Sequence, residues 1–336
     1  MSAKSPLRIL RWLVWLLAFG LVAALAAWWY VAMRPLVLSA PRVEFLVPAG
    51  ASARTIAQAA HKAGVDLNDT LFVLLARATD ATKNLHAGRY VVEEGATLAS
   101  LLDKLRKGEV LPSKFALIEG MTLRDLRARL AQEADLRQDS ARMSEAELLA
   151  AIGATEKHAE GLFAPDTYLY APGSSDLDLL RQAYRAQQKI LSEAWEKRAP
   201  GLPLANPYEA LILASIVEKE TGRAEDRPMV ASVFVNRLKI RMPLQTDPTV
   251  IYGLGEKFDG NLRKRDLTTD TPWNTYTRGG LPPTPIASPG RAAIQAALNP
   301  AASSKLYFVA RGDGSSHFSD NLTEHNRAVD KFIRGR

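Results

Sequence analysis

The longest apolar stretch of the chain lies near its N-terminus, at residues 12–33. It contains no charged residue, and at the helical rise of about 1.5 Å per residue it spans about the 30 Å of a bilayer core. Tryptophans lie near both of its ends, and Lys4, Arg8 and Arg11 precede it. By the positive-inside rule, this pattern predicts one transmembrane helix, with residues 1–11 in the cytoplasm and the bulk of the chain outside.

The alternative for this stretch is a cleaved signal peptide, because small residues are frequent at 23–27. Signal-peptide cores are usually shorter, and here the bulky Trp28, Trp29 and Tyr30 follow the small residues directly. The sequence also lacks the cysteine that a lipobox anchor requires. The pattern therefore favours a retained helix.

A second apolar run lies within residues 206–222. Eight consecutive positions there are apolar except for Ser215, so the predicted helix has no polar face over two turns and must be buried nearly all round. Asn206 and Pro207 supply an N-cap and a first-turn proline, and Gly222 supplies a C-terminal glycine. The pattern predicts a core helix with both ends marked.

Between the two apolar runs, the pattern alternates short strands with short amphipathic helices. A strand, a glycine turn, a Ser or Thr cap and a helix follow one another three times, starting near residues 45, 90 and 115. With another helix at 69–78, residues 43–92 have the predicted order strand, helix, helix, strand. This βααβ order resembles the LysM module, which binds N-acetylglucosamine-containing glycans in other proteins. The alternative is a small module that only orients the rest of the chain.

The remainder of the chain mixes helices with isolated strands. We predict helices at 123–130, 143–152, 177–198, 230–238, 247–253, 289–298 and 323–333, a strand at 306–309, and a proline- and glycine-rich loop at 257–289. The predicted fold class is therefore α+β. The predicted parts are a transmembrane helix (12–33), a linker (34–42), a LysM-like module (43–112) and a larger α+β domain (113–336).

The composition agrees with a globular protein attached to a membrane. The chain has 336 residues, of which 47% are hydrophobic and 24% charged, enough for one large core or two moderate ones. Cysteine is absent, which excludes thiol catalysis and cysteine-ligated metal and fits an exported protein without disulfides. The net charge of +7 comes from 43 Lys and Arg scattered among 36 Asp and Glu, without a basic run interleaved with aromatics, so no nucleic-acid partner is expected.

Glu218 is the first charged residue after the buried run and the main candidate for chemistry. It lies in the last helical turn, where the helix dipole disfavours negative charge, and its neighbours one turn back leave it little water. Both effects raise the pKa of a carboxyl group, and a Glu protonated near neutral pH is what a general acid requires. The alternative is a solvent-exposed carboxylate beside Lys219 and Glu220, and spacing alone favours neither.

The run Ala-Ser-Ile-Val-Glu-Lys-Glu-Thr at 214–221 resembles the motif of the endolytic murein transglycosylase (MltG, or YceG-like) family, in which the first Glu of the run is catalytic. Further segments resemble family motifs in family order: 160–168, 230–238, 244–252, 274–276, 280–283, 307–310, 317–318 and 325–326. Such a series over the last half of the chain is far more specific than one short motif. The resemblance implies that Glu218 is the catalytic residue of a lytic transglycosylase.

Two polar residues before the predicted helix at 247–253 are candidates for substrate binding. Gln245 and Thr246 offer an amide and a hydroxyl of the kind that orient N-acetyl sugars. Asp247 is either the N-cap of this helix, which the N-cap preference favours by about two to one, or a second carboxylate of the site.

The loop at 257–289 and the C-terminal histidines contribute further candidates. Long ordered loops are commonly functional, and this one carries Trp273, Asn274, Tyr276 and Thr277, which suit sugar stacking and hydrogen bonding. His317 is a candidate for hydrogen bonding near the groove. His317 and His325 without a third ligand at a recognisable spacing make a weak zinc site, so we expect no metal and no cofactor.

The resemblance implies a membrane-anchored lyase that cleaves nascent peptidoglycan strands between N-acetylmuramic acid and N-acetylglucosamine and leaves 1,6-anhydro-N-acetylmuramyl ends. It would terminate strand elongation at the bacterial cell inner membrane, with the N-terminus cytoplasmic and the catalytic domain (113–336) periplasmic. The implied partners are the glycan strands, peptidoglycan synthases of the penicillin-binding protein class, and membrane lipid around the single helix.

Two alternatives remain open at this stage. One is a muramidase that hydrolyses the strand, with Glu218 as acid and Asp247 or Glu220 as the second carboxylate. Residues two apart on a helix point to different faces, which disfavours Glu220 in that role. The other alternative is a non-enzymatic anchor that holds glycan through the LysM-like module.

Overall fold

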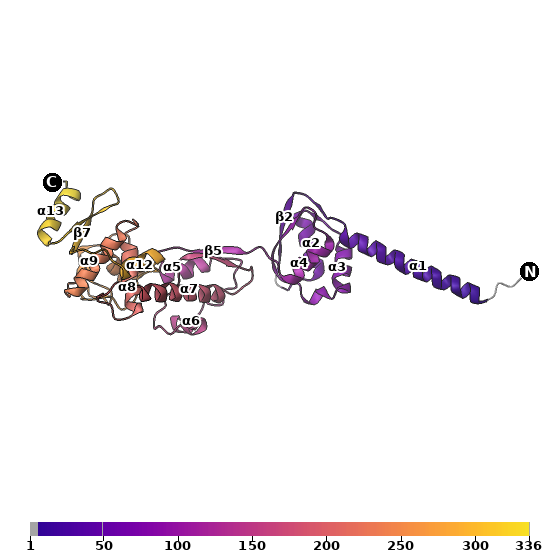
Figure 1. The fold of residues 1–336 in the computed structure, drawn as a ribbon, viewed down its shortest axis with the longest axis horizontal. Coiled ribbons are helices and arrows are strands. Elements are labelled where there is room, and N and C mark those ends of the chain that lie inside the picture. The colour runs from indigo at the N-terminus through magenta and orange to yellow at the C-terminus, as the bar shows by residue number, and fades with distance from the viewer. Residues whose placement is uncertain (1–5, 49, 336) are drawn as a thin grey trace, which may run out of the picture. The chain divides into compact units, whose positions relative to one another are not determined.

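The computed structural model describes residues 6–48 and 50–335. It begins with α1 (Pro6–Met33), in which Arg11–Met33 is long and apolar enough to cross a membrane, with a mean hydropathy of 2.0 (Figure 1). Large apolar side chains along it, such as Trp12 and Trp15, are exposed, a surface that suits lipid. The predicted helix at 12–33 is confirmed as a candidate membrane anchor. The start of the predicted cytoplasmic segment, including Lys4, lies outside the described residues.

The chain divides into two compact units. The first runs to Ser113 and includes the segment Leu169–Ser174, and the second comprises Lys114–Tyr168 and the chain from Ser175 onward. The division of the chain into a LysM-like module (43–112) and a catalytic domain (113–336) stays a prediction.

The first unit is built on an antiparallel pair of strands. β2 (Arg42–Val47) pairs with β4 (Gly88–Glu93), so that Phe45 lies opposite Tyr90. The other elements of the unit are β1 (Val37–Leu38), which pairs with β3 (Val65–Asp66), the helices α2 (Ala53–Ala63), α3 (Asp69–Ala78) and α4 (Leu98–Lys107), and the 3-10 turn η1 (Ala81–Lys83).

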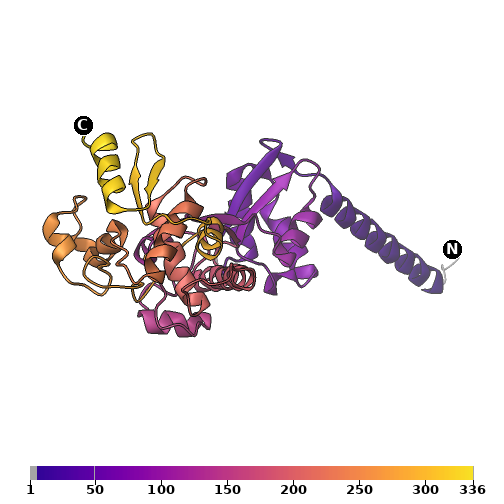
Figure 2. The same cartoon turned by 60° about the vertical axis from the view of Figure 1, so that its left-hand side comes forward.

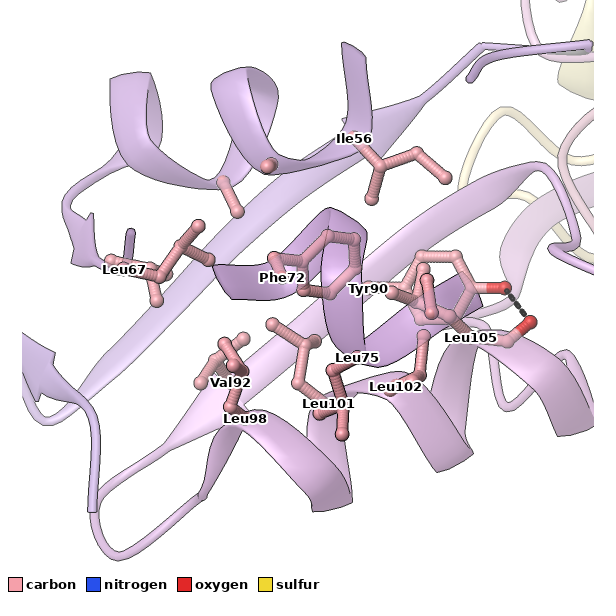
Figure 3. Packing of buried hydrophobic residues seen from close by; sticks show 14 of the residues in the cluster. Ile56, Leu67, Phe72, Leu75, Tyr90, Val92, Leu98, Leu101, Leu102 and Leu105 are labelled. Atoms are coloured by element: carbon pink, nitrogen blue, oxygen red, sulfur yellow. Dashed lines mark hydrogen bonds between the residues drawn. The ribbon is translucent and has the colours of Figure 1, made fainter. Parts of the chain in front are cut away.

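One apolar core joins these strands and helices. Ile56 of α2, Phe72 of α3 and Leu101 of α4 are buried in the same cluster as Tyr90 of β4 (Figure 3). The Tyr90 hydroxyl donates a hydrogen bond to the carbonyl of His86 (2.9 Å), so its one polar atom has a partner inside the core. The order strand, helix, helix, strand agrees with the pattern, whereas the likeness to a LysM module stays a prediction.

The second unit is mainly helical (Figure 1, Figure 2). Its helices are α5 (Leu123–Leu130), α6 (Glu145–Ile152), α7 (Asp176–Glu196), α8 (Pro207–Glu220), α9 (Arg227–Lys239), α10 (Asp247–Leu254), α11 (Lys264–Thr268), α12 (Arg291–Leu298) and α13 (Leu322–Phe332), with a 3-10 turn η2 (Gly255–Lys257). The strands of this part of the chain are β5 (Ser113–Leu117) with β6 (Asp166–Tyr170), and β7 (Tyr307–Ala310) antiparallel to β8 (Ser316–Ser319). The predicted α+β class is confirmed, although the predicted loop at 257–289 contains α11.

Helix α8 packs against α7, α9, α10 and α12. Its residues 210–217 are all buried, as the pattern predicts. The side chain of Asn206 accepts a hydrogen bond from the Glu209 N–H (3.0 Å), which confirms the N-cap. Ser215, the polar residue of the run, donates to the Ile212 carbonyl (2.7 Å) and accepts from the Ile286 N–H (3.0 Å). The polar side chain inside this buried run therefore has hydrogen-bond partners, as a core helix requires.

Two predicted helix ends differ from the structure. The C-cap of α8 is Thr221 in an extended conformation, so the chain leaves the helix without the left-handed turn that would require Gly222. The helix predicted at 289–298 begins at Arg291, with Gly290 as its N-cap. Ser288, which precedes the helix, is buried, and its N–H donates to the Met121 carbonyl (2.7 Å) in a neighbouring segment.

Candidate active site

The C-terminal end of α8 opens into a cavity of about 360 Å³, which we call the Glu220 cavity. Its walls come from α8, α9, the start of α10, the loop before α12, β7 and α13. The lining residues are Glu220, Phe234, Arg237, Leu244, Gln245, Asp247, Tyr276, Tyr307, Phe308, Leu322 and His325. Segments far apart in the sequence therefore meet at this end of the helix.

Glu220 is the carboxyl group at the base of this cavity. The Thr246 hydroxyl donates a hydrogen bond to its Oε1. Burial raises the pKa of Glu220 to about 7; the charge of Asp247 acts in the same direction, and the Thr246 bond and the charge of Arg237 oppose it. A carboxyl group with this pKa exists in both forms at neutral pH, so it can donate a proton and accept one back.

A network of threonines shapes the segment that carries Gln245. This residue has a φ of +48°, in the left-handed region that residues other than glycine seldom adopt. Its N–H donates to the Thr275 carbonyl (3.1 Å), and the Thr246 N–H donates to the Thr275 hydroxyl (3.1 Å). The hydroxyls of Thr275 and Thr249 share a further bond (2.9 Å). Buried hydrogen bonds thus hold a strained residue in the cavity wall, a combination that is common at functional sites.

Asp247 faces the same cavity and does not cap its helix. Thr246 is the N-cap of α10 and Asp247 is the first helical residue, so the preferred assignment of Asp247 as the N-cap is wrong by one position. Instead, the Tyr276 hydroxyl donates to Asp247 Oδ1 (2.5 Å). Burial and the neighbouring Asp247 raise the pKa of Tyr276, so the tyrosine keeps its proton. The carboxylate of Asp247 is therefore available to the cavity.

Arg237 contacts three walls of the cavity, and the sequence pattern did not predict this role. Its side chain is buried, with Nε donating to the Leu306 carbonyl (2.7 Å) and Nη1 donating to the Leu244 carbonyl (2.7 Å). The guanidinium carbon also lies 5.1 Å from the centroid of the Tyr307 ring. The sequence signal that could have found it is an arginine inside the mainly apolar helical pattern at 230–238.

Of the two C-terminal histidines, His325 lines the cavity and His317 does not. The His325 ring stacks on Tyr307 with 5.2 Å between centroids, and burial lowers its pKa, so it is neutral at pH 7. His317 lies on β8, where its Nδ1 is 3.4 Å from Arg311 and its ring packs against Phe332. The predicted substrate contact of His317 therefore gains no support from the cavity.

Two further predicted binding residues hold loops in place. Asn274 is fully buried, and its amide nitrogen donates to three backbone carbonyls within residues 266–269. Its side-chain oxygen accepts the N–H of Tyr276 (2.9 Å). Thr277 donates to Asp270 (2.8 Å) and lies outside the cavity lining. The polar atoms of Asn274 are used internally to position Tyr276, so its predicted direct sugar contact gains no support from this geometry and stays a prediction.

Glu218 points to another side of α8. Its Oε2 accepts the N–H of Gly290 (2.8 Å) at the start of α12, and its Oε1 lies 3.7 Å from Nη2 of Arg227 at the start of α9. The side chain is 6% exposed. Burial raises its pKa, as predicted; the Gly290 bond opposes that rise, and the charge of Glu119 adds to it. Glu218 thus supplies the acceptor at the start of α12 and pairs with an arginine.

The fold and the site define a class of protein. A buried carboxyl group with a pKa near 7, beside a second carboxylate and several hydrogen-bonding side chains, characterises an enzyme that works by general acid–base catalysis. Among the described residues, no group of three or more His, Asp or Glu side chains is placed to hold a metal ion. The YceG-like family model matches residues 45–331, so the chain belongs to the YceG-like family and the resemblance inferred from its motifs is confirmed.

Individual relatives agree with the family assignment. The chain is 31% identical to the endolytic murein transglycosylase of Bacillus subtilis, over 88% of this chain and 86% of that one. It is 29% identical to a protein of the same name from Streptococcus pneumoniae, over 86% of this chain and 58% of that longer one. The crystal structure of a yceG-like protein from Listeria monocytogenes matches with a TM-score of 0.53 at 29% identity, over 85% of this chain and 98% of that one.

Proposed function

We propose that this protein is an endolytic murein transglycosylase, a lyase that cleaves peptidoglycan glycan strands within their length. The observation that carries the proposal is the Glu220 cavity, in which a carboxyl group with a pKa of about 7 lies among amide, hydroxyl and carboxylate groups. The names of the Bacillus and Streptococcus relatives support the same activity.

In this mechanism Glu220 acts first as the general acid. It protonates the oxygen between N-acetylmuramic acid and N-acetylglucosamine, so the bond from muramyl C1 to that oxygen breaks and the N-acetylglucosamine end leaves as an alcohol. The Glu220 carboxylate then takes the proton of the muramyl C6 hydroxyl, whose oxygen bonds to C1. Glu220 thus regains the proton that it donated, no water is consumed, and the product has a 1,6-anhydro end.

The surroundings of Glu220 suit both steps. Burial keeps the carboxyl protonated before cleavage, and the Thr246 hydroxyl with the charge of Arg237 stabilises the carboxylate afterwards. Asp247, held by Tyr276, places negative charge on the cavity wall. That charge offsets the positive charge that develops on C1 in an oxocarbenium-like transition state. Gln245 supplies an amide for an N-acetyl group.

Glu218 remains the acid that the motif resemblance implies, and that assignment stays a prediction. The geometry favours Glu220 in its place. Oε2 of Glu218 accepts the Gly290 N–H, Oε1 lies 3.7 Å from the Arg227 guanidinium, and the residue does not line the Glu220 cavity. A proton donor must reach the scissile oxygen, and among the two glutamates Glu220 faces an open space of sufficient size.

A second candidate function is hydrolysis of the same bond, which the position of Asp247 favours. With the capping role removed, Asp247 is a second carboxylate on the same cavity as Glu220, and two carboxyl groups are what a glycosidase uses. In that case Asp247 would activate a water molecule or attack C1, and the product would be a reducing end.

The product distinguishes the two functions. Full-length protein in detergent is incubated with purified sacculi in heavy-oxygen water, and the released fragments are weighed by mass spectrometry. A transglycosylase gives 1,6-anhydro ends, lighter by one water than reducing ends and free of label. Labelled reducing ends would overturn the proposal in favour of hydrolysis, and sacculi bound without release would support a non-enzymatic anchor.

We also propose that α1 is a single-pass anchor in the bacterial inner membrane, with the N-terminus cytoplasmic and the second unit periplasmic. There the enzyme would meet nascent strands and peptidoglycan synthases, so that cleavage ends strand growth, while the LysM-like module contributes glycan contacts. Because the chain lacks cysteine, a Lys239→Cys variant carries one thiol at an exposed position. Modification by a membrane-impermeant maleimide in intact spheroplasts is expected; complete protection would contradict this orientation.

A further inference from the structure

A second and wider cavity lies in the second unit, with a volume of about 970 Å³. It is bordered by the start of α5, by α10 and by the segments that follow α10. Glu160, Lys219, Ile251, Tyr252, Phe258 and Trp273 are the lining residues that matter here. We call it the aromatic cavity, and the proton transfers described above make no use of it.

The lining has the two kinds of surface that a pyranose sugar requires. Tyr252, Phe258 and Trp273 present aromatic carbon to the apolar C–H faces of a sugar ring. Carboxylates on the same lining, among them the exposed Glu256, accept hydrogen bonds from the hydroxyls at the ring edge. An aromatic wall with a few polar groups is the usual composition of a small-molecule site.

The aromatic wall is held in position by the protein itself. The Tyr252 and Trp273 rings meet edge to face with 5.5 Å between centroids, and the Trp273 indole N–H donates to the Thr284 hydroxyl (2.9 Å). The Tyr252 hydroxyl donates to Glu160 (3.0 Å). The two Glu160 oxygens also accept the Leu123 N–H at the start of α5 (3.0 and 3.1 Å). A ligand would therefore meet rings that are already placed, which lowers the entropy cost of binding.

The aromatic cavity borders the same two helices as the Glu220 cavity. At the end of α8, Lys219 lines the aromatic cavity and the next residue, Glu220, lines the other. At the start of α10, Asp247 lines the Glu220 cavity, whereas Pro248 and the following turn, with Ile251, line the aromatic cavity. Because consecutive helix residues point in different directions, the two cavities lie on different faces of the same two helices, within one unit.

We propose that the aromatic cavity binds a second segment of the same glycan strand, a run of N-acetylated sugars away from the bond that is cut. The inference rests on the proposed function for the identity of the strand. At about 360 Å³ the Glu220 cavity is near the lower limit of ligand pockets, and at about 970 Å³ the aromatic cavity is near the upper limit. Cleavage within a strand requires sugars on both sides of the bond, and the second cavity provides the space.

The test compares two identical substitutions in full-length protein in detergent. Phe258→Ala removes an aromatic side chain from the aromatic cavity, and Phe332→Ala removes one from α13, where it lines neither cavity. Both phenylalanines are half-buried, so the packing losses are similar, and melting temperatures show whether each variant is folded. Steady-state cleavage is measured on long glycan strands and on a tetrasaccharide.

We expect Phe258→Ala to raise KM for long strands about tenfold at unchanged kcat, with no change for the tetrasaccharide, and Phe332→Ala to change neither. A KM within twofold of the wild type for Phe258→Ala would overturn the inference. A rise in KM that is equal for long and short substrates would also overturn it, because the cavity would then not lie away from the bond.

A binding measurement keeps this inference separate from the catalytic proposal. The indole N–H resonance of Trp273, identified by its loss in Trp273→Phe, is followed by NMR while the hexamer of N-acetylglucosamine is added. A shift that saturates in the wild type and is lost in Phe258→Ala supports the inference whatever product the enzyme makes. If sacculi give 1,6-anhydro ends but the Trp273 resonance does not move, the aromatic-cavity inference alone fails.

Discussion

Glu218 and Glu220 lie two positions apart at the end of α8, yet they face different parts of the second unit. Burial raises the pKa of both. Glu218 is turned toward the Gly290 N–H and the Arg227 guanidinium, both of which favour the charged form. Glu220 is turned toward an open cavity and is bound by a neutral hydroxyl.

The difference separates a structural carboxylate from a candidate acid. A raised pKa accompanies burial in both places, so it does not identify a catalytic residue by itself. What differs is the nature of the partners and the space in front of the group. A carboxylate that accepts a backbone N–H at the start of another helix has a structural role. A carboxyl group that faces a cavity can exchange its proton with a bound ligand.

The largest expected effect is the difference in strand cleavage between substitutions at the two glutamates. Glu220→Gln removes the proposed acid and should lower strand cleavage by roughly 10²–10⁴-fold. Glu218→Gln keeps a hydrogen-bond acceptor for Gly290 and should leave cleavage within about fivefold of the wild type, in line with a role outside the transition state. Release of muropeptides from sacculi measures both. The reverse ranking would make Glu218 the acid, as the motif resemblance implies.

The pH dependence of stability probes the carboxyl groups with the highest pKa values. Burial raises the pKa of Glu220 and of Glu160 from 4.5 to about 7 each. The folded state therefore binds more protons than the unfolded state between pH 4.5 and 7, so the free energy of unfolding should fall as pH rises through this window. Each group contributes up to about 3 kcal/mol.

Denaturant titrations at pH 5 and pH 7.5 test this expectation. Glu160→Gln and Glu220→Gln should each remove part of the decline with rising pH. Glu209→Gln is the matched control, because Glu209 is half-exposed at the first turn of α8. Equal stability of the wild type at the two pH values would show that neither carboxyl group is protonated in the folded protein.

A smaller effect is expected on the Glu218 side of α8. Arg227→Gln removes the positive charge 3.7 Å from Glu218, whose side chain is 6% exposed. A buried carboxylate without its partner is unfavourable, so the free energy of unfolding should fall by about 2 kcal/mol, a little less than for a close buried pair. Thermal unfolding measures the loss. Cleavage by the folded variant should stay near the wild-type rate, and a rate loss of tenfold or more would place Arg227 in the catalytic machinery.

The smallest effect concerns the strained residue of the Glu220 cavity. Gln245→Gly relieves a φ of +48° but adds flexibility to the unfolded chain, so stability should change by less than about 1 kcal/mol. KM should rise because the amide is lost. Gln245→Asn, which tolerates this backbone better and keeps an amide, should lose less affinity than Gln245→Gly. Equal KM values for the two variants would argue against an amide contact.

The sequence pattern predicts most helices of the second unit, because they have local signals, but it misses the short elements α11, β6 and β8. The apolar run with its Asn206 cap specifies α8, and the Thr122 and Ser144 caps mark α5 and α6. Two of the predicted binding residues, Gln245 and Tyr276, do line one cavity, and Thr246 bonds to Glu220 beneath it.

What the pattern could not predict depends on contacts between distant segments. Helical periodicity states that Glu218 and Glu220 face apart, but which side is open is decided by residues 244–247 and by Tyr276. Asp247 differs from an N-cap by a single position, which lies within the usual uncertainty of helix ends. The amide of Asn274 is of a kind that binds sugars, and only the fold shows that it donates its hydrogen bonds to backbone carbonyls.

Side chains of helix α8 that point away from the Glu220 cavity make hydrogen bonds to neighbouring segments. Glu218 accepts the Gly290 N–H, and Ser215 accepts the Ile286 N–H. The Lys219 ammonium donates to the Gly120 carbonyl (3.3 Å). The carrier of the proposed acid is thus fixed before any strand arrives. Sugar contacts made elsewhere need not order this helix, so their binding energy is free to strain the muramyl ring toward its transition-state shape. A fixed acid and a distorted sugar ring would together favour attack by the C6 hydroxyl of the same sugar.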